Sequence, residues 1–171
     1  MEKKYNSDDE SSLVKSFEFQ LRMFEKGADA IQRHIERLDE VLFKVKASGV
    51  TVWVALVGWS FTSENVLLML LGLVVILGFW LLEGYFRGIQ ARYLAASTSL
   101  TRFLNDEQAL KTSFDNHHLP PRIVYPMTFT ETELEKLKMY GKGLIAPSVA
   151  ILYLFLAFVN YLLWIAVGGQ G

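Results

Sequence analysis

Apolar residues recur at alternating steps of three and four along the first part of the chain. This heptad seam consists of Val14, Phe17, Leu21, Phe24, Ala28, Ile31, Ile35, Leu38, Leu42 and Val45. The spacing is the a/d pattern of helices that wind around one another. The same steps continue through Gly49, Val52, Leu56 and Trp59, which already lie in an uncharged stretch. One helix is therefore predicted to join a polar helical region to a membrane span.

Three stretches of the chain contain no charged residue: 47–63, 65–82 and 143–171. A membrane-spanning helix needs roughly 20 apolar residues, so the last stretch spans unaided and the first two borrow flanking residues. Residues 64 and 65 are expected to form the turn of a helical hairpin. With no strand-like alternation, the predicted fold is an all-α membrane protein. It has three transmembrane helices and a cytosolic helical bundle, with helices continuous across the membrane boundary.

The basic residues predict the orientation. All 17 Lys and Arg residues lie before the first uncharged stretch or between the second and third, and cytoplasmic loops are the ones that retain such residues. The N-terminus is therefore expected in the cytoplasm and the C-terminus on the periplasmic or extracellular side. The expected parts are a disordered tail (1–12), a cytosolic heptad helix (13–46), a transmembrane hairpin (47–83), cytosolic helices with a Pro-rich loop (84–142) and a third span (143–168).

A second cytosolic helix is predicted over residues 89–114, where the three-four spacing resumes, and it is able to pack antiparallel on the first. Thr130 and Glu133 suggest a capping box that starts a third helix. Gly141, Gly143 and Pro147 should bend or interrupt that helix as it enters the third span.

The residues that flank the heptad seam indicate what kind of helix packs against it. Glu18, Glu25 and Asp39 occupy e positions, and Gln20, Gly27, His34 and Val41 occupy g positions. Because these do not form opposite-charge pairs, a simple parallel dimer is not indicated. The seam then serves either higher-order association or packing on the chain's own second helix, as the core of a monomeric bundle.

No constellation of catalytic residues is found. The chain has no cysteine, and His117 and His118 have no acidic residue beside them at a helical metal-ligand spacing. Gly141, Lys142 and Gly143 lack the longer pattern of a phosphate-binding loop. Neither an enzyme nor a metal or cofactor site is expected.

Several polar or small residues fall within the uncharged stretches or at their ends. Glu83 closes the second stretch, and Arg87 stands four residues later within reach of it, as a structural anchor or as the inner mouth of a pore. Asn160 either bonds a neighbouring helix or lines a water-filled path. Glu64 would form an acidic ring near the outer entrance if subunits assemble around an axis.

The first stretch carries one face of small or weakly polar residues, which we call the first-span face. It consists of Ser48, Thr51, Ala55, Gly58 and Thr62. Such a face suits either close helix packing or the lining of a water-filled path.

Basic residues gather on the cytosolic side and are candidates for ligand binding. They are Arg22, Arg33, Arg37, Lys44, Lys46, Arg87, Arg92, Arg102, Lys138 and Lys142. They suit an anionic ligand such as a nucleotide or a single-stranded oligonucleotide. Anchoring to anionic lipid headgroups is the alternative for the residues just inside the membrane, which are Lys44, Lys46, Arg87, Arg92, Lys138 and Lys142.

Two stretches resemble a known group of proteins. One is RHIERLDE at 33–40, continued by FKVK at 43–46 and VT at 50–51; the other is FWLLEGYFR at 79–87 with Gln90 and Arg92. They are similar to small bacterial membrane proteins encoded in antiphage-defence loci, most closely the membrane effectors of Hailong-type systems. The similarity covers the first two spans and their cytosolic flanks.

This resemblance implies a homo-oligomeric, tetrameric ion channel of the bacterial inner membrane. Its opening would depolarise the infected cell, an abortive infection. A single-stranded oligodeoxyadenylate, made by a partner nucleotidyltransferase, would hold the channel shut. The competing interpretation is a membrane-anchored coiled-coil scaffold or sensor without a pore.

Overall fold

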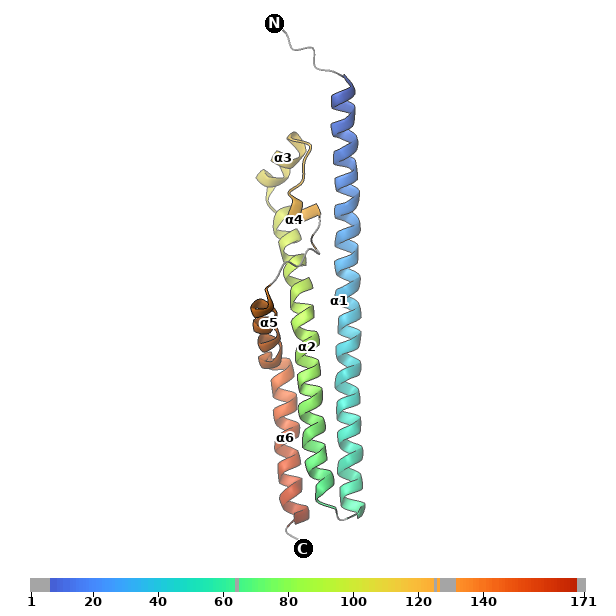
Figure 1. Ribbon diagram of the computed structural model, residues 1–171, viewed down its shortest axis with the longest axis vertical. Helices are drawn as coiled ribbons and strands as arrows, with labels where there is room; N and C mark the ends of the chain where they lie inside the picture. The colour runs from blue at the N-terminus through green and yellow to red at the C-terminus, as the bar shows by residue number, and fades with distance from the viewer. Residues whose placement is uncertain (1–6, 64, 125, 127–131, 169–171) are drawn as a thin grey trace. The chain divides into compact units, whose positions relative to one another are not determined.

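The computed structural model describes residues 7–63, 65–124, 126 and 132–168. These residues form α-helices and no β-strand, in agreement with the predicted all-helical class (Figure 1). In chain order the helices are α1 (Ser7–Ser63), α2 (Leu67–Leu104), α3 (Glu107–Asp115), α4 (Pro121–Val124), α5 (Glu133–Ile145) and α6 (Pro147–Gly168).

The chain divides into two compact units. Unit 1 contains Met1–Glu36 and Arg92–Thr130, and unit 2 contains Arg37–Ala91 and Glu131–Gly171. Both α1 and α2 therefore contribute residues to each unit. The predicted boundaries lie at the ends of the uncharged stretches. The boundaries between the two units lie instead within the polar portions of α1 and α2.

Among the described residues, α1, α2 and α6 each contain a stretch that is long and apolar enough to cross a membrane. We call the uncharged part of each that lies in unit 2 span 1 (residues 47–63 of α1), span 2 (residues 67–82 of α2) and span 3 (α6). They run side by side (Figure 1) and share one hydrophobic core. Its buried members are Trp53, Ile76, Val149, Tyr153 and Leu156.

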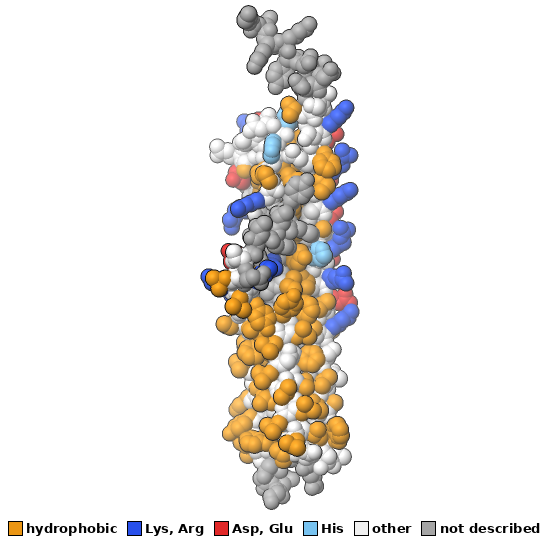
Figure 2. All heavy atoms as spheres, viewed as in Figure 1, with side chains coloured by type: hydrophobic (Ala, Val, Ile, Leu, Met, Phe, Trp, Pro, Cys, Tyr) orange, Lys and Arg blue, Asp and Glu red, His pale blue; other side chains and the backbone are white. Residues whose placement is uncertain are grey.

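The outward surface of the spans is also apolar. Val74, Leu154 and Phe155 are each 60% or more exposed, and hydrophobic side chains cover the visible face of the spans in Figure 2. A contiguous apolar surface of this extent is unfavourable in water and suits contact with lipid.

The predicted interruption before span 3 is confirmed. Pro147 has no backbone N–H and cannot continue the hydrogen bonding of α5, so α5 ends at Ile145 and α6 starts afresh. The amides of Val149 and Ala150 bond to the carbonyl of Ala146, 2.8 and 2.9 Å away. The indole Nε1 of Trp80 donates to the carbonyl of Leu144 at 3.1 Å, which satisfies an acceptor at the end of α5.

Glycines let α5 lie directly against α2. A Cβ atom on Gly143 would come within 2.9 Å of the amide nitrogen of Gly88 and closer still to the carbonyl oxygen of Gly84. The two backbones therefore touch where these residues meet, as small residues permit between helices in a membrane. The glycines of α2 are thus met by a segment of the same chain.

In unit 1 the heptad seam packs on the chain's own second helix. Ile31 is buried with Leu100 of α2 and Ile123 of α4. Phe17 is buried against Leu119 and Val124. These seam residues therefore form intramolecular core, which is one of the two arrangements that the flanking charges left open.

The helix predicted over residues 89–114 ends earlier than expected. It ends at Leu104 instead of running through to residue 114, and α3 restarts at Glu107. The carboxylate of Asp106 accepts a hydrogen bond from the amide of Ala109 at 3.0 Å, so Asp106 caps α3. Capping by Asp competes with helix continuation, and here it prevails over the apolar spacing.

The capping box of α5 lies two residues later than predicted. Thr132 caps the helix, and its side chain and that of Glu135 bond reciprocally to each other's backbone amides. Thr130, the predicted cap, lies outside the described residues.

At the other end of the chain, α1 already begins at Ser7. Residues 7–12 are therefore helical instead of disordered, and residues 1–6 of the expected tail lie outside the described residues.

The hairpin between spans 1 and 2 turns at Asn65, as expected. The hydroxyl of Ser60 donates to the carbonyl of Asn65 at 2.9 Å, and the Asn65 side chain accepts from the amide of Leu67 at 3.0 Å.

Candidate functional site

A buried ion pair holds the three spans together near residue 46. The Nζ atom of Lys46 lies 3.2 Å from Oε1 of Glu83, which is fully buried. The same Nζ donates to the carbonyl of Ser148 at 3.3 Å. Lys46 thus connects α1 to both α2 and α6. An ionised carboxylate is costly near lipid unless it is paired, and Lys46 supplies the opposite charge.

The hydroxyl of Tyr153 also belongs to this polar cluster. Tyr153 of α6 is 3% exposed, and its phenol interacts electrostatically with Glu83 without forming a hydrogen bond. Lys46 and Tyr153 were not paired with Glu83 from the sequence. Little in the sequence indicated the pairing with Lys46, because Lys46 lies on α1 and is separated from Glu83 along the chain by spans 1 and 2.

Arg87, the expected partner of Glu83, makes a different contact. Its Nη1 donates to Oε1 of Gln90 at 2.7 Å, and Nε2 of Gln90 donates to Oδ1 of Asp39 at 2.6 Å. Gln90 is 3% exposed, so this chain of hydrogen bonds ties α2 to α1 in a partly dry environment. Arg87 therefore acts in the contact between helices of unit 2.

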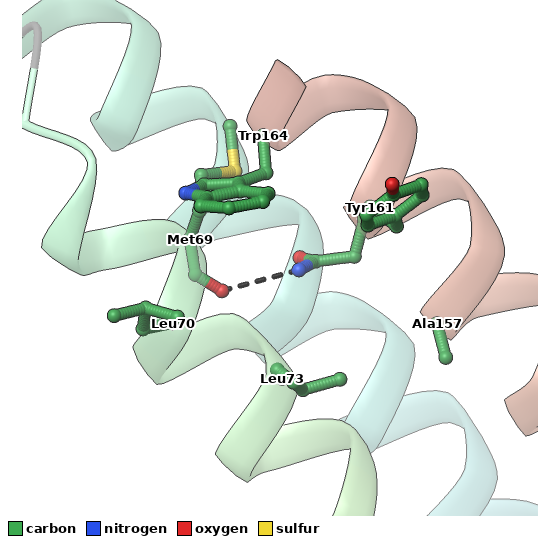
Figure 3. Close-up of a pocket in the computed structure, with 7 residues that line it drawn as sticks. Met69, Leu70, Leu73, Ala157, Tyr161 and Trp164 are labelled. Carbon is green, nitrogen blue, oxygen red and sulfur yellow. Dashed lines mark hydrogen bonds between the residues drawn. The ribbon is translucent and has the colours of Figure 1, made fainter. Parts of the chain in front are cut away.

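Asn160 bonds neighbouring helices, which is one of its two predicted roles. Its Oδ1 accepts from Nε1 of Trp53 at 3.0 Å, and its Nδ2 donates to the carbonyl of Met69 at 3.2 Å. One amide of α6 thus fastens span 1 and span 2 together (Figure 3 draws the bond to Met69). Asn160 is 4% exposed, so within a single chain it is a packing residue.

A pocket of about 180 Å³ lies beside this contact. The side chains of Tyr161 and Trp164 stand on its α6 side, and Leu70 and Leu73 stand on its α2 side (Figure 3). Its lining is apolar apart from Asn160, whose polar atoms already bond to Trp53 and Met69.

The first-span face differs from these buried contacts because all five of its residues are exposed. A Cβ atom on Gly58 would meet no atom within 4 Å. The hydroxyls of Thr51 and Thr62 donate to backbone carbonyls four residues earlier in their own helix, at 2.9 and 3.1 Å. Packing within one chain therefore leaves this face uncovered. Glu64, predicted to form an acidic ring near the outer entrance, lies outside the described residues.

The candidate ligand-binding residues divide into two groups. Lys44, Lys46 and Arg87 already bond to Glu40, to Glu83 and to Gln90, respectively. The exposed members are Arg22, Arg33, Arg37, Arg102, Lys138 and Lys142, while Arg92 is half-buried. Of these seven, Arg22, Arg33, Arg92 and Arg102 belong to unit 1, and Arg37, Lys138 and Lys142 to unit 2.

Within the described ranges, no three His, Cys, Asp or Glu side chains cluster in a way that could hold a metal ion.

Comparison of the chain with protein-family models, with curated proteins and with solved structures finds no match in any of the three.

Proposed function

We propose that the chain forms a homo-oligomeric ion channel in which copies assemble around the first-span face. The observation that carries this proposal is the contrast between two kinds of polar residue in the spans. Glu83 and Asn160 are buried and bonded within one chain, whereas the first-span face is exposed in full.

The chemistry of that face fits a water-filled path or the contact between copies that surrounds one. Small residues at steps of three and four let helix backbones approach closely. Hydroxyls bonded to their own backbone, such as those of Thr51 and Thr62, still offer oxygen lone pairs to water or to a cation. The tetrameric state is an expectation from the resemblance to Hailong-type effectors.

We place ligand control on the exposed arginines of unit 1, which are Arg22, Arg33 and Arg102. In this proposal an anionic oligonucleotide such as an oligodeoxyadenylate binds them, and its loss opens the channel and depolarises the cell during antiphage defence. Single-stranded nucleic acids are bound by basic side chains together with stacking aromatic rings. His34 and Tyr93 supply stacked rings with centroids 5.0 Å apart in unit 1, in the same unit as Arg33.

A pore-less membrane-anchored scaffold or sensor is the second candidate. It is favoured by the same bonds of Thr51 and Thr62 to backbone carbonyls, because hydroxyls satisfied in this way also tolerate a dry helix contact.

Ion flux from liposomes distinguishes the two candidates. The purified chain is reconstituted with a potassium gradient, and flux is measured with and without single-stranded oligodeoxyadenylate, with oligodeoxythymidylate as the control. Channel function predicts flux that the adenylate suppresses. Absence of flux under every condition, from protein that native mass spectrometry shows to be oligomeric, supports the scaffold.

A further inference from the structure

An open groove runs along the contact between α2 and α5 in unit 2. Its volume is about 630 Å³, within the about 300–1,000 Å³ of typical small-molecule sites. The groove is lined by Gly78, Leu81, Leu82, Tyr85, Lys136, Leu137 and Tyr140. It opens on the outward side of span 2, where Leu81 and Leu82 are 47% and 42% exposed.

The floor and walls of the groove are fixed by contacts within unit 2. A Cβ atom on Gly78 would meet nothing within 4 Å, so the floor is open at this residue. The hydroxyl of Tyr140 donates to the carbonyl of Leu81 at 3.2 Å. The rings of Tyr85 and Tyr140 meet edge to face, with centroids 6.3 Å apart. The groove is thus a formed feature of the helix contact.

The position of the groove along α2 indicates what fills it. Gly78, Leu81 and Leu82 belong to the uncharged run that ends before Glu83, and Tyr85 stands just beyond it. The groove therefore crosses from the hydrocarbon region to the interface, where tyrosine is favoured. An occupant must be apolar at one end and polar at the other.

The charge on α5 indicates the sign of the polar end. Lys136 lines the groove, and Lys138 and Lys142 are exposed on the same helix. The carboxylate of Glu135 is engaged by the amide and hydroxyl of Thr132, at 2.9 and 3.1 Å. With Leu134 and Leu137 more than 60% exposed, α5 has the composition of an interfacial helix that attracts anionic lipid.

We propose that this groove binds an anionic phospholipid of the adjacent leaflet. One acyl chain lies over Gly78, Leu81 and Leu82, and the headgroup phosphate contacts Lys136. The lipid fills the space between span 2 and α5 and so holds α5 at the membrane surface. This assignment does not depend on whether the protein conducts ions.

Native mass spectrometry of the full chain tests the proposal. The protein is released from micelles with equal amounts of phosphatidylglycerol and phosphatidylcholine, and retained lipid is counted. The wild type should retain phosphatidylglycerol in preference. Lys136→Gln should reduce that preference about fivefold, the effect of one basic residue at an anionic surface. The matched control Lys138→Gln removes a lysine of α5 that does not line the groove.

A second pair of variants tests the apolar part. Gly78→Leu fills the floor and should lower retention of both lipids, while Val74→Leu adds bulk one turn earlier on the same helix, outside the groove. Equal retention of the two lipids by the wild type would overturn the proposal. So would equal losses in Lys136→Gln and Lys138→Gln, since these would indicate diffuse attraction to α5, or unchanged retention in both Lys136→Gln and Gly78→Leu.

Discussion

Lys46 of α1 and Glu83 of α2 form an ion pair that is fully buried on its acidic side and one third exposed on its basic side, with 33% of the Lys46 side chain accessible. This asymmetry decides what each group does when the other is removed. A stranded lysine turns toward water, whereas a stranded glutamate has no route to it.

Removing Lys46 should therefore cost more stability than removing the charge of Glu83. We expect Lys46→Met to lower the free energy of unfolding by roughly 3 kcal/mol, since it leaves a buried charge unpaired. Glu83→Gln should cost less, and the double variant should recover most of the loss of Lys46→Met. Denaturant unfolding in mixed micelles measures all three. Equal losses in the two single variants would contradict the asymmetry.

Gly143 and Gly141 lie on the same helix but in opposite surroundings. Gly143→Ala places a methyl group against the backbone of α2, so we expect a loss of stability of about 2 kcal/mol, as for other overpacked sites. Gly141→Ala meets no atom within 4 Å and should stabilise the helix by up to about 1 kcal/mol. Thermal unfolding of the two variants should move in opposite directions. Similar shifts would show that α5 does not touch α2 at Gly143.

Asn160 should contribute to stability through both of its hydrogen bonds. Asn160→Leu is expected to cost about 1 to 2 kcal/mol, because hydrogen bonds in membranes contribute about 0.6 kcal/mol on average and the Trp53 indole loses its acceptor. Trp53→Phe combined with Asn160→Leu should cost less than the sum of the single changes. Additive costs in this double-mutant cycle would contradict a stabilising hydrogen bond between Trp53 and Asn160.

The ion pair of Lys44 with Glu40 should affect how the Glu40 carboxyl titrates. Lys44 donates to Glu40 at 2.6 Å, and this bond lowers the pKa of the Glu40 carboxyl below its ordinary value of 4.5. A lowered pKa in the folded protein means that the stabilisation is present above the ordinary pKa and lost as the pH falls through the folded value. Lys44→Gln should raise the pKa of Glu40 toward 4.5, measured by NMR titration of the labelled side chain. An unchanged titration would show that the pair does not persist in solution.

Much of the fold follows from local pattern. The spacing of the heptad seam predicted the long first helix, and Pro147 predicted the break before span 3. The register of α5 was not predictable in this way, because Thr130 and Thr132 are each followed by a glutamate three residues later. Both satisfy the capping-box pattern, and the structure uses Thr132.

The candidate site was predicted in part, because partner choice depends on packing between helices. Glu83 was recognised as costly near lipid, but its partner is Lys46, a residue from another helix. Arg87, near in sequence, bonds to Gln90 instead. The sequence showed the first-span face but not its exposure, since the side of span 1 that faces the other spans is set by Trp53 and its contact with Asn160.

Cysteine scanning of span 1 tests the channel proposal most directly, because the chain has no cysteine of its own. Single cysteines at Thr51, Ala55, Gly58 and Thr62 are compared with one at Val54, which is exposed but lies outside the first-span face. Currents across planar bilayers are recorded before and after a charged, water-soluble thiol reagent is added. We predict that the reagent reduces the current at positions of the first-span face and leaves it unchanged at Val54. The contradicting result is an undiminished current at all four positions of the face, together with mass spectra in which none of the four cysteines is modified. That result would exclude a water-filled path along this face.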